Sequence, residues 1–212
     1  MAFDVESYQA QERRWPQAGR VILAQFDSET VQVYQAYRPG IARFAVEHGY
    51  FGGDFKLGRM TWIKPNFLWM MYRSSWGQSP DQEVVLAVRI KRSAFDEILR
   101  ASVHSTFRAQ VYDSEQSWRE RLAHSDVRLQ WDPDHAPGGE PVARRAIQLG
   151  LRGAAAAAYA REWVVSIDDV SEFVAEQRAA LRGADYSELS TPREEPYPVA
   201  GDIAEHLELE SD

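Results

Sequence analysis

The sequence contains no cysteine, which excludes disulfide bonds, zinc thiolate sites and thiol nucleophiles. It also lacks any apolar run near the ~20 residues that a membrane-spanning helix needs. No basic segment followed by an apolar one opens the chain, so no secretory signal is visible. These absences predict a cytoplasmic protein with no membrane partner. An apolar content of 44% over 212 residues is typical of a folded domain with a real core.

Acidic residues outnumber basic ones by 32 to 24, which gives a net charge of −8. This balance argues against a generally basic nucleic-acid-binding protein. The charge is uneven, however: residues 185–212 carry nine acidic residues and one basic residue, so the remainder is close to neutral and can still contain a local cationic site. We predict an N-terminal arm over residues 1–19, one domain over 20–182 and an acidic, disordered tail over 183–212.

The common motifs of metal, phosphate and hydrolase sites are absent. The five histidines are far apart, and no HExxH or DxDxDG spacing occurs, so we predict no metal. The glycines of residues 49–53 match neither a dinucleotide-binding nor a P-loop pattern. No GxSxG elbow is present for a serine hydrolase. The function must therefore be inferred from less common sequence patterns.

Alternating and continuous apolar patterns predict the main elements. Residues 30–38 alternate in the manner of a strand, and Pro39 begins a helix that Gly49 ends. Residues 83–91 are nearly continuous in apolar residues and predict a central strand. Helices and strands mix without strict alternation. We therefore predict an α+β domain with a split, largely antiparallel β-sheet flanked by helices.

The segment from Arg59 to Gly77 has the most unusual composition. Tryptophans recur at positions 62, 69 and 76, and a helix that begins at an N-cap Thr61 and ends near Gly77 would place them on one face. A strand over residues 67–72 is the competing prediction. In the helical interpretation the middle of the segment packs in the core, and its leading edge, residues 59–64, faces any site.

Two interpretations fit the aromatic and cationic residues of this segment, one functional and one structural. Trp62, Lys64, Arg73 and Trp76 could form a non-catalytic module that binds a nucleotide or single-stranded nucleic acid, by stacking on bases and neutralising phosphates. Alternatively, the tryptophans are only core residues and the charged groups extend outward to solvent. Glu162, at the start of a strand predicted over residues 162–167, is a further candidate for a functional residue.

Several long motifs resemble one known family. They are the run from Arg59 to Ser74, with Tyr37-Arg38-Pro39 before it, and Gln130-Trp131-Asp132-Pro133 and residues 147–153 after it. The sequence resembles the family called domain of unknown function 4291 (DUF4291) over about residues 30–175. This family name implies no activity.

More distantly, the order of elements resembles the ADP-ribosyltransferase superfamily, whose split β-sheet surrounds a cleft for NAD. The resemblance implies an ADP-ribosyltransferase-like enzyme that uses NAD to modify an acceptor, which nucleic acid or protein could provide. Glu162 would be the catalytic carboxylate that stabilises an oxocarbenium-like ribose. An arginine can bind pyrophosphate bidentately, and an aromatic ring can stack on nicotinamide. The implied cofactor-binding residues are Tyr37, Arg38, Arg59, Thr61, Trp62 and Lys64.

Overall fold

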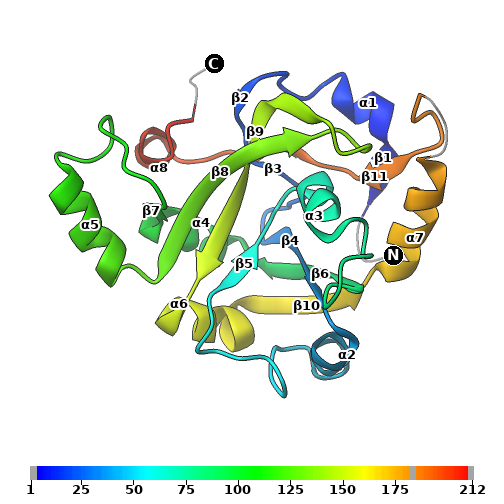
Figure 1. Cartoon of the computed structure of the whole chain (residues 1–212), viewed down its shortest axis with the longest axis horizontal. Coiled ribbons are helices and arrows are strands. Elements are labelled where there is room, and N and C mark those ends of the chain that lie inside the picture. The colour runs from blue at the N-terminus through cyan, green and yellow to red at the C-terminus, as the bar shows by residue number, and fades with distance from the viewer. Residues whose placement is uncertain (1–3, 182–184, 210–212) are drawn as a thin grey trace.

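The computed structural model describes residues 4–181 and 185–209, which form a mixed α+β domain built on two main β-sheets (Figure 1). The smaller main sheet has the strand order β10-β6-β4, and the larger has the order β2-β9-β8-β7, with β5 also paired to β9. The predicted α+β class is confirmed. Strands of the smaller sheet are β4 (Thr30–Tyr37), β6 (Val84–Lys91) and β10 (Val164–Asp169). Strands of the larger sheet are β2 (Gly19–Arg20), β5 (Thr61–Ile63), β7 (Val103–His104), β8 (Val127–His135) and β9 (Pro141–Leu151).

The smaller sheet is antiparallel throughout, and β6 lies at its centre, as the apolar run of that strand predicts. Its residues from Val85 to Val88 are completely buried. The larger sheet contains the long, curved β8 and β9 (Figure 1), which pair antiparallel, whereas β2 and β7 add to it in parallel. The sheets are therefore largely antiparallel, and each buries apolar residues on the face that it turns to the core.

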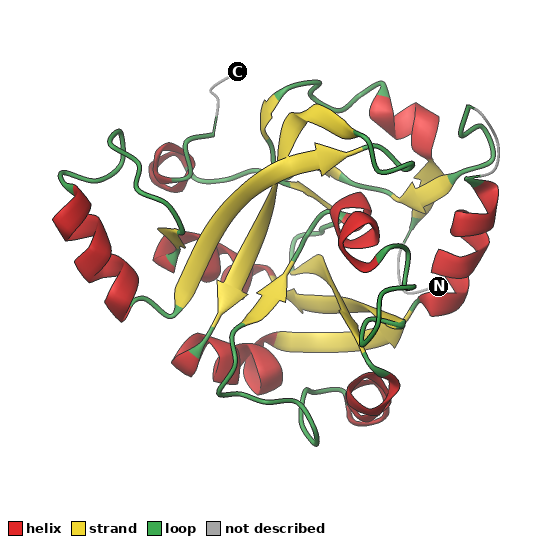
Figure 2. Cartoon of the chain, viewed as in Figure 1, coloured by secondary structure: helices red, strands yellow, loops and turns green. Residues whose placement is uncertain are grey.

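Helices surround the strands in the view of Figure 2, and α3 packs against both main sheets through β4 and β8. Among the described residues, no helix is both long and apolar enough to cross a membrane. The helices are α1 (Tyr8–Glu12), α2 (Pro39–His48), α3 (Phe67–Ser74), α4 (Arg92–Ala101), α5 (Glu115–His124), α6 (Gly153–Ala158), the π-helix η1 (Tyr159–Trp163), α7 (Ser171–Ala180) and α8 (Gly201–His206). The short strands outside the main sheets are β1 (Val5–Ser7), β3 (Leu23–Ala24), β11 (Ser190–Pro192) and β12 (Glu195–Pro196).

The helix predicted to begin at Thr61 starts later. Residues 61–63 form strand β5 instead, and α3 begins after the N-cap Asn66, whose side chain accepts a hydrogen bond from the Trp69 amide at 2.6 Å. Pro65 explains the difference, because a proline disfavours helical backbone in the residue before it. Trp62 therefore lies on a strand, and the prediction that the three tryptophans share one helix face was wrong.

The end of the chain also differs from the disordered tail that its composition predicts. Its described residues, 185–209, contain β11, β12 and α8, and the side chains of Tyr197, Ile203 and Leu207 are buried. The N-terminal arm pairs with this segment, because β1 is antiparallel to β11. Apolar residues spaced among the acidic ones are the physical reason for the order. Residues 182–184 and 210–212 of the predicted tail lie outside the described residues.

Glu194 joins the arm, the C-terminal segment and α3. Its carboxylate is 1% exposed and accepts hydrogen bonds from the Phe67 amide at 2.6 Å and from Asn66 Nδ2 at 3.2 Å. Its own backbone amide donates to Gln11 Oε1, and its carbonyl oxygen accepts from Trp15 Nε1. Because this carboxylate already occupies the N-terminus of α3, that terminus does not offer a phosphate site.

The pKa of Glu194 provides a test of this junction. Burial raises the pKa of its carboxyl well above the usual value of 4.5, so the folded protein binds this proton more tightly than the unfolded chain. Its stabilising contribution is complete below pH 4.5 and is lost as pH rises from there toward the folded-state pKa. We expect Glu194→Gln, which cannot ionise, to flatten this part of the pH dependence of the free energy of unfolding.

Urea denaturation in steps from about pH 5 to about pH 8 measures the effect. The neighbouring Glu195→Gln is the matched control, because Glu195 is exposed and pairs with exposed Arg193. The same pH slope in wild type and Glu194→Gln would contradict the expectation.

Candidate functional site

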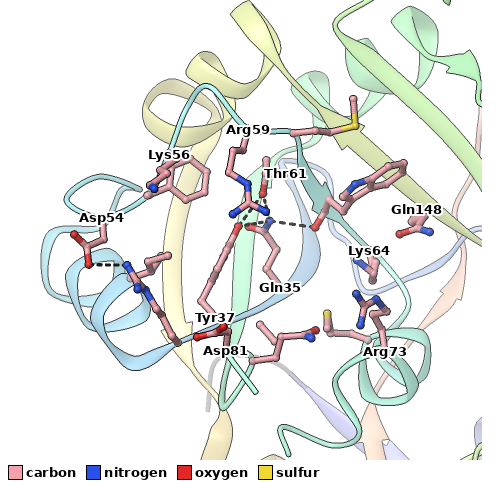
Figure 3. A pocket seen from close by; sticks show the side chains of 18 of the residues that line it. Gln35, Tyr37, Asp54, Lys56, Arg59, Thr61, Lys64, Arg73, Asp81 and Gln148 are labelled. Atoms are coloured by element: carbon pink, nitrogen blue, oxygen red, sulfur yellow. Dashed lines mark hydrogen bonds and ion pairs between the residues drawn. The ribbon is translucent and has the colours of Figure 1, made fainter. Parts of the chain in front are cut away.

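A cavity of about 650 Å³ opens where the two main sheets meet (Figure 3). Its walls come from β4, β5, the loop before β5, α3 and the paired strands β8 and β9. Figure 3 shows Asp54 on one side, Lys64, Arg73 and Gln148 on the other, and Gln35, Tyr37 and Thr61 between them. The lining residues are Gln35, Ala36, Tyr37, Arg38, Ile41, Asp54, Phe55, Lys56, Arg59, Met60, Thr61, Trp62, Lys64, Met70, Arg73, Asp81, Gln82, Gln130 and Gln148.

A buried hydrogen-bond network centred on Gln35 forms the floor of the cavity. Gln35 is 3% exposed, and its Nε2 donates to Thr61 Oγ1 at 2.7 Å and to the Tyr37 hydroxyl at 2.8 Å. Its Oε1 accepts from the Tyr159 hydroxyl of η1 at 2.7 Å. Burial raises the pKa of Tyr37 to about 12, so this phenol stays protonated at neutral pH. The network fixes Tyr37 and Thr61 at the cavity wall.

Lys64 brings a buried ammonium group to the cavity. The residue is 5% exposed, and it makes no side-chain hydrogen bond or ion pair with any residue in the described ranges. Burial, with a smaller contribution from the Arg73 charge, lowers the pKa of Lys64 to about 7, while Asp132 opposes the shift. A half-charged buried amine without a partner is unfavourable, because polar groups taken out of water need compensating contacts. This amine is therefore suited to an anion that enters the cavity.

Other cations surround the cavity and are more exposed. Arg38 pairs with Asp54 at 2.9 Å, on the surface. Arg59, Lys56 and Arg73 are exposed and have no side-chain partner among the residues that the structure describes. The lining thus carries five cationic residues against two acidic ones, Asp54 and Asp81. A local positive potential arises in a chain whose net charge is −8.

One wall of the cavity carries two glutamines oriented by one carboxylate. Asp132 on β8 accepts a hydrogen bond from Gln130 Nε2 at 2.8 Å and another from Gln148 Nε2 at 2.7 Å. Beside them, Trp62 on β5 pairs with Gly150 on β9. A Cβ atom added at Gly150 would lie 3.1 Å from the Trp62 ring and 2.7 Å from Met60 Sδ, so only glycine lets the indole lie this close to the strand.

The cavity brings together all six residues predicted to bind a cofactor: Tyr37, Arg38, Arg59, Thr61, Trp62 and Lys64. The leading edge of the Arg59–Gly77 segment therefore faces the cavity, whereas residues 67–71 are buried in the core, as expected. Glu162 does not line the cavity. It is exposed within η1, and the strand predicted to begin at Glu162 begins at Val164. The alanine-rich helix α6 continues into one π-helical turn, which delays the strand.

Sequence reasoning missed the floor and one wall of the cavity. Gln35 occupied an inward position of an alternating strand, and a polar residue at such a position was the available signal. Gln130 and Gln148 appeared within motifs of the family resemblance, without a role. Their meeting depends on the register of β8 and β9, which pairs them directly. No local pattern contains that information.

The fold and the cavity define the class of this protein as a mixed α+β domain with a cationic cavity between its two main sheets. The model of the family described as domain of unknown function (DUF4291) matches residues 21–197, and the chain belongs to this family. A comparison with curated proteins gives no significant match. The family match adds no support for the more distant likeness to ADP-ribosyltransferases.

The floor of the cavity can be tested through Tyr159, whose side chain is completely buried. Tyr159→Phe leaves Gln35 Oε1 buried without its donor, and an unsatisfied buried acceptor costs about 1–3 kcal/mol. We expect a loss of this size in the free energy of unfolding, measured by urea denaturation. Tyr50→Phe is the control, because the Tyr50 hydroxyl has no described hydrogen-bond partner and its loss should change stability by less than about 0.5 kcal/mol. Equal effects of the two substitutions would show that the Gln35 network does not stabilise the fold.

Proposed function

We propose that the cavity binds a nucleotide through its phosphate groups, and that NAD is the first candidate. The observation that carries this proposal is Lys64, a cavity-lining residue that is 5% exposed and whose side chain has no hydrogen-bond or ion-pair partner among the described residues. An anionic ligand would supply the missing hydrogen bonds, and hydrogen bonds to charged groups are stronger than those between neutral groups. Arg73 lies close enough to lower the pKa of Lys64 and would share the same anion.

The size and lining of the cavity support a ligand larger than a simple anion. A volume of about 650 Å³ is within the range of small-molecule and cofactor sites. Trp62, Tyr37 and Phe55 add aromatic surface to the cationic lining, and nucleotides combine a ring that stacks with phosphates that carry charge. The net charge of −8 favours a free nucleotide over a long nucleic acid, which needs an extended basic surface.

ADP-ribosyl transfer is the second candidate, and the observation that favours it is that all six predicted cofactor-binding residues line one cavity. In this reaction the bond between ribose and nicotinamide breaks, and the acceptor forms a bond to the same carbon and loses a proton. The catalytic carboxylate is the weaker element of this candidate, because Glu162 is exposed and does not line the cavity. Binding and transfer therefore need separate tests.

Replacement of Lys64 tests nucleotide binding. We expect Lys64→Met, which keeps the length of the side chain and removes its charge, to weaken NAD binding by about tenfold to a hundredfold. Binding should also depend on pH. In the protein without ligand, the pKa of Lys64 is about 7, and a bound anion raises this pKa. The affinity for NAD is therefore highest below pH 7, and it falls above pH 7 by at most about tenfold per pH unit. Isothermal titration calorimetry at several pH values measures both effects.

The diphosphate of NAD has no protonation step near neutral pH, so Lys64→Met should remove the pH dependence. Lys91→Met is the control, because Lys91 is exposed on β6 and does not line the cavity. A short single-stranded oligonucleotide, titrated in parallel, distinguishes a nucleic-acid ligand from a free nucleotide. NAD affinity unchanged by Lys64→Met, or the absence of binding by any nucleotide, would refute the proposal.

Release of nicotinamide tests the transfer reaction. If the cavity catalyses ADP-ribosyl transfer with Glu162 as the catalytic carboxylate, the wild-type protein releases nicotinamide from NAD, and Glu162→Gln abolishes the release. Glu172→Gln, an exposed carboxylate on α7, should release nicotinamide at the wild-type rate. Chromatography of the reaction mixture measures the product. Binding of NAD without release would assign the cavity to binding alone.

A further inference from the structure

We propose that the wall of the cavity formed by β5, β9 and β8 recognises an amino-substituted nucleobase of the adenine type. Base recognition by this wall rests on the proposed nucleotide-binding function, because the phosphates of the same ligand would lie at Lys64 and Arg73. Trp62, Gln148 and Gln130 line this wall, and Asp132 accepts a hydrogen bond from each of the two glutamines.

The strand register places these residues in successive rows on one face of the sheet. Gln130 and Gln148 are direct partners across β8 and β9, so their side chains share a face of the sheet. Ile63, the last residue of β5, pairs with Leu149, so Lys64 follows β5 close to Gln148, and both residues line the cavity. Figure 3 shows Lys64, Arg73 and Gln148 on the same side of the cavity. A ligand with a phosphate at Lys64 therefore also meets the amide groups of this wall.

Asp132 fixes the orientation of both amides. An ionised carboxylate only accepts hydrogen bonds, so each glutamine must turn its Nε2 toward Asp132. The two Oε1 atoms then face other directions, and neither accepts a hydrogen bond from any residue within the described ranges. Each Nε2 retains a second hydrogen. Each amide thus offers one acceptor and one donor in a fixed arrangement.

This arrangement suits the edge of adenine. Adenine presents an amino donor at N6 beside an acceptor at N7, and a glutamine amide can pair with both. In hypoxanthine an oxygen replaces the amino group, and this oxygen would face the glutamine carbonyl. A bidentate contact of this kind discriminates by roughly fivefold to a hundredfold.

Trp62 supplies a surface on which the base can stack. Its indole lies against β9 at Gly150, two residues along the strand from Gln148 and on the same face of the sheet. Stacking on an aromatic ring accepts any base, whereas the glutamines distinguish between bases. The wall therefore combines general affinity with selectivity.

Calorimetric titration with ADP and with inosine diphosphate tests the proposal, because the two ligands differ only at C6 of the base, which carries an amino or an oxo group, and in the hydrogen that hypoxanthine carries at N1. We expect the wild-type protein to bind ADP roughly fivefold to a hundredfold more tightly. Gln148→Met and Asp132→Asn should each reduce this ratio to about twofold or less, the first by removing an amide and the second by letting the amides reverse. Gln78→Met, at an exposed glutamine outside the cavity, should leave the ratio unchanged.

Inorganic pyrophosphate separates failure of this proposal from failure of the proposed function. We expect Gln148→Met to bind pyrophosphate as the wild type does, because the phosphate contacts remain. If both nucleotides bind the wild type with equal affinity, base recognition by this wall is refuted and nucleotide binding stands. If neither nucleotide nor pyrophosphate binds, both proposals are refuted. A wild-type ratio that persists in both variants would place base recognition elsewhere.

Discussion

The side chain of Gln35 joins the two main sheets at the point where the cavity forms. From β4 of the smaller sheet it donates hydrogen bonds to the Thr61 hydroxyl and the Trp62 carbonyl on β5 of the larger sheet. It also accepts a hydrogen bond from the hydroxyl of Tyr159 in η1. A buried amide with so many partners is stabilising only while all of them are present, because each unpaired polar group would be penalised. The relative position of β4, β5 and η1 is therefore fixed together, and with it the floor of the cavity.

The residues on either side of this contact place Lys64. Tyr34, next to Gln35, forms an isolated antiparallel bridge with Lys64, with backbone hydrogen bonds of 2.7 and 3.3 Å. Pro65 then prevents Lys64 from joining α3. Lys64 is thus fixed at its backbone on one side and excluded from a helix on the other, and its side chain is directed to the cavity. The same contacts that connect the sheets also bury the ammonium group that we assign to ligand binding.

Local sequence patterns correctly predicted the elements whose formation depends on neighbouring residues. The apolar run of β6 and the proline and glycine that bound α2 correspond to elements in the structure. The cavity-facing edge at residues 59–64 was also predictable, because cationic and aromatic residues gather there at a boundary between elements. The start of α3 was predicted wrongly, because Pro65 disfavours helical backbone at Lys64 and the helix begins only after Asn66.

Features that depend on contacts between residues far apart in the sequence could not be predicted from local patterns. Gln130 and Gln148 come together through strand register, and Glu194 reaches the start of α3 from the far end of the chain. The acidic composition of that end suggested disorder, although Tyr197, Ile203 and Leu207 are spaced to enter the core. Glu162 was assigned from the order of elements alone, and a π-helical turn leaves it on the surface.

The contrast between two buried ionisable groups separates structure from function in this protein. Glu194 is buried, and its carboxylate accepts two hydrogen bonds, so its environment is complete and its role is to join segments of the chain. Lys64 is buried to a similar degree, and no residue in the described part of the chain satisfies its side chain. A fold under selection for stability alone would gain by replacing such a lysine with an apolar residue. Its presence in the wall of a cationic cavity is best explained by a ligand that completes its contacts.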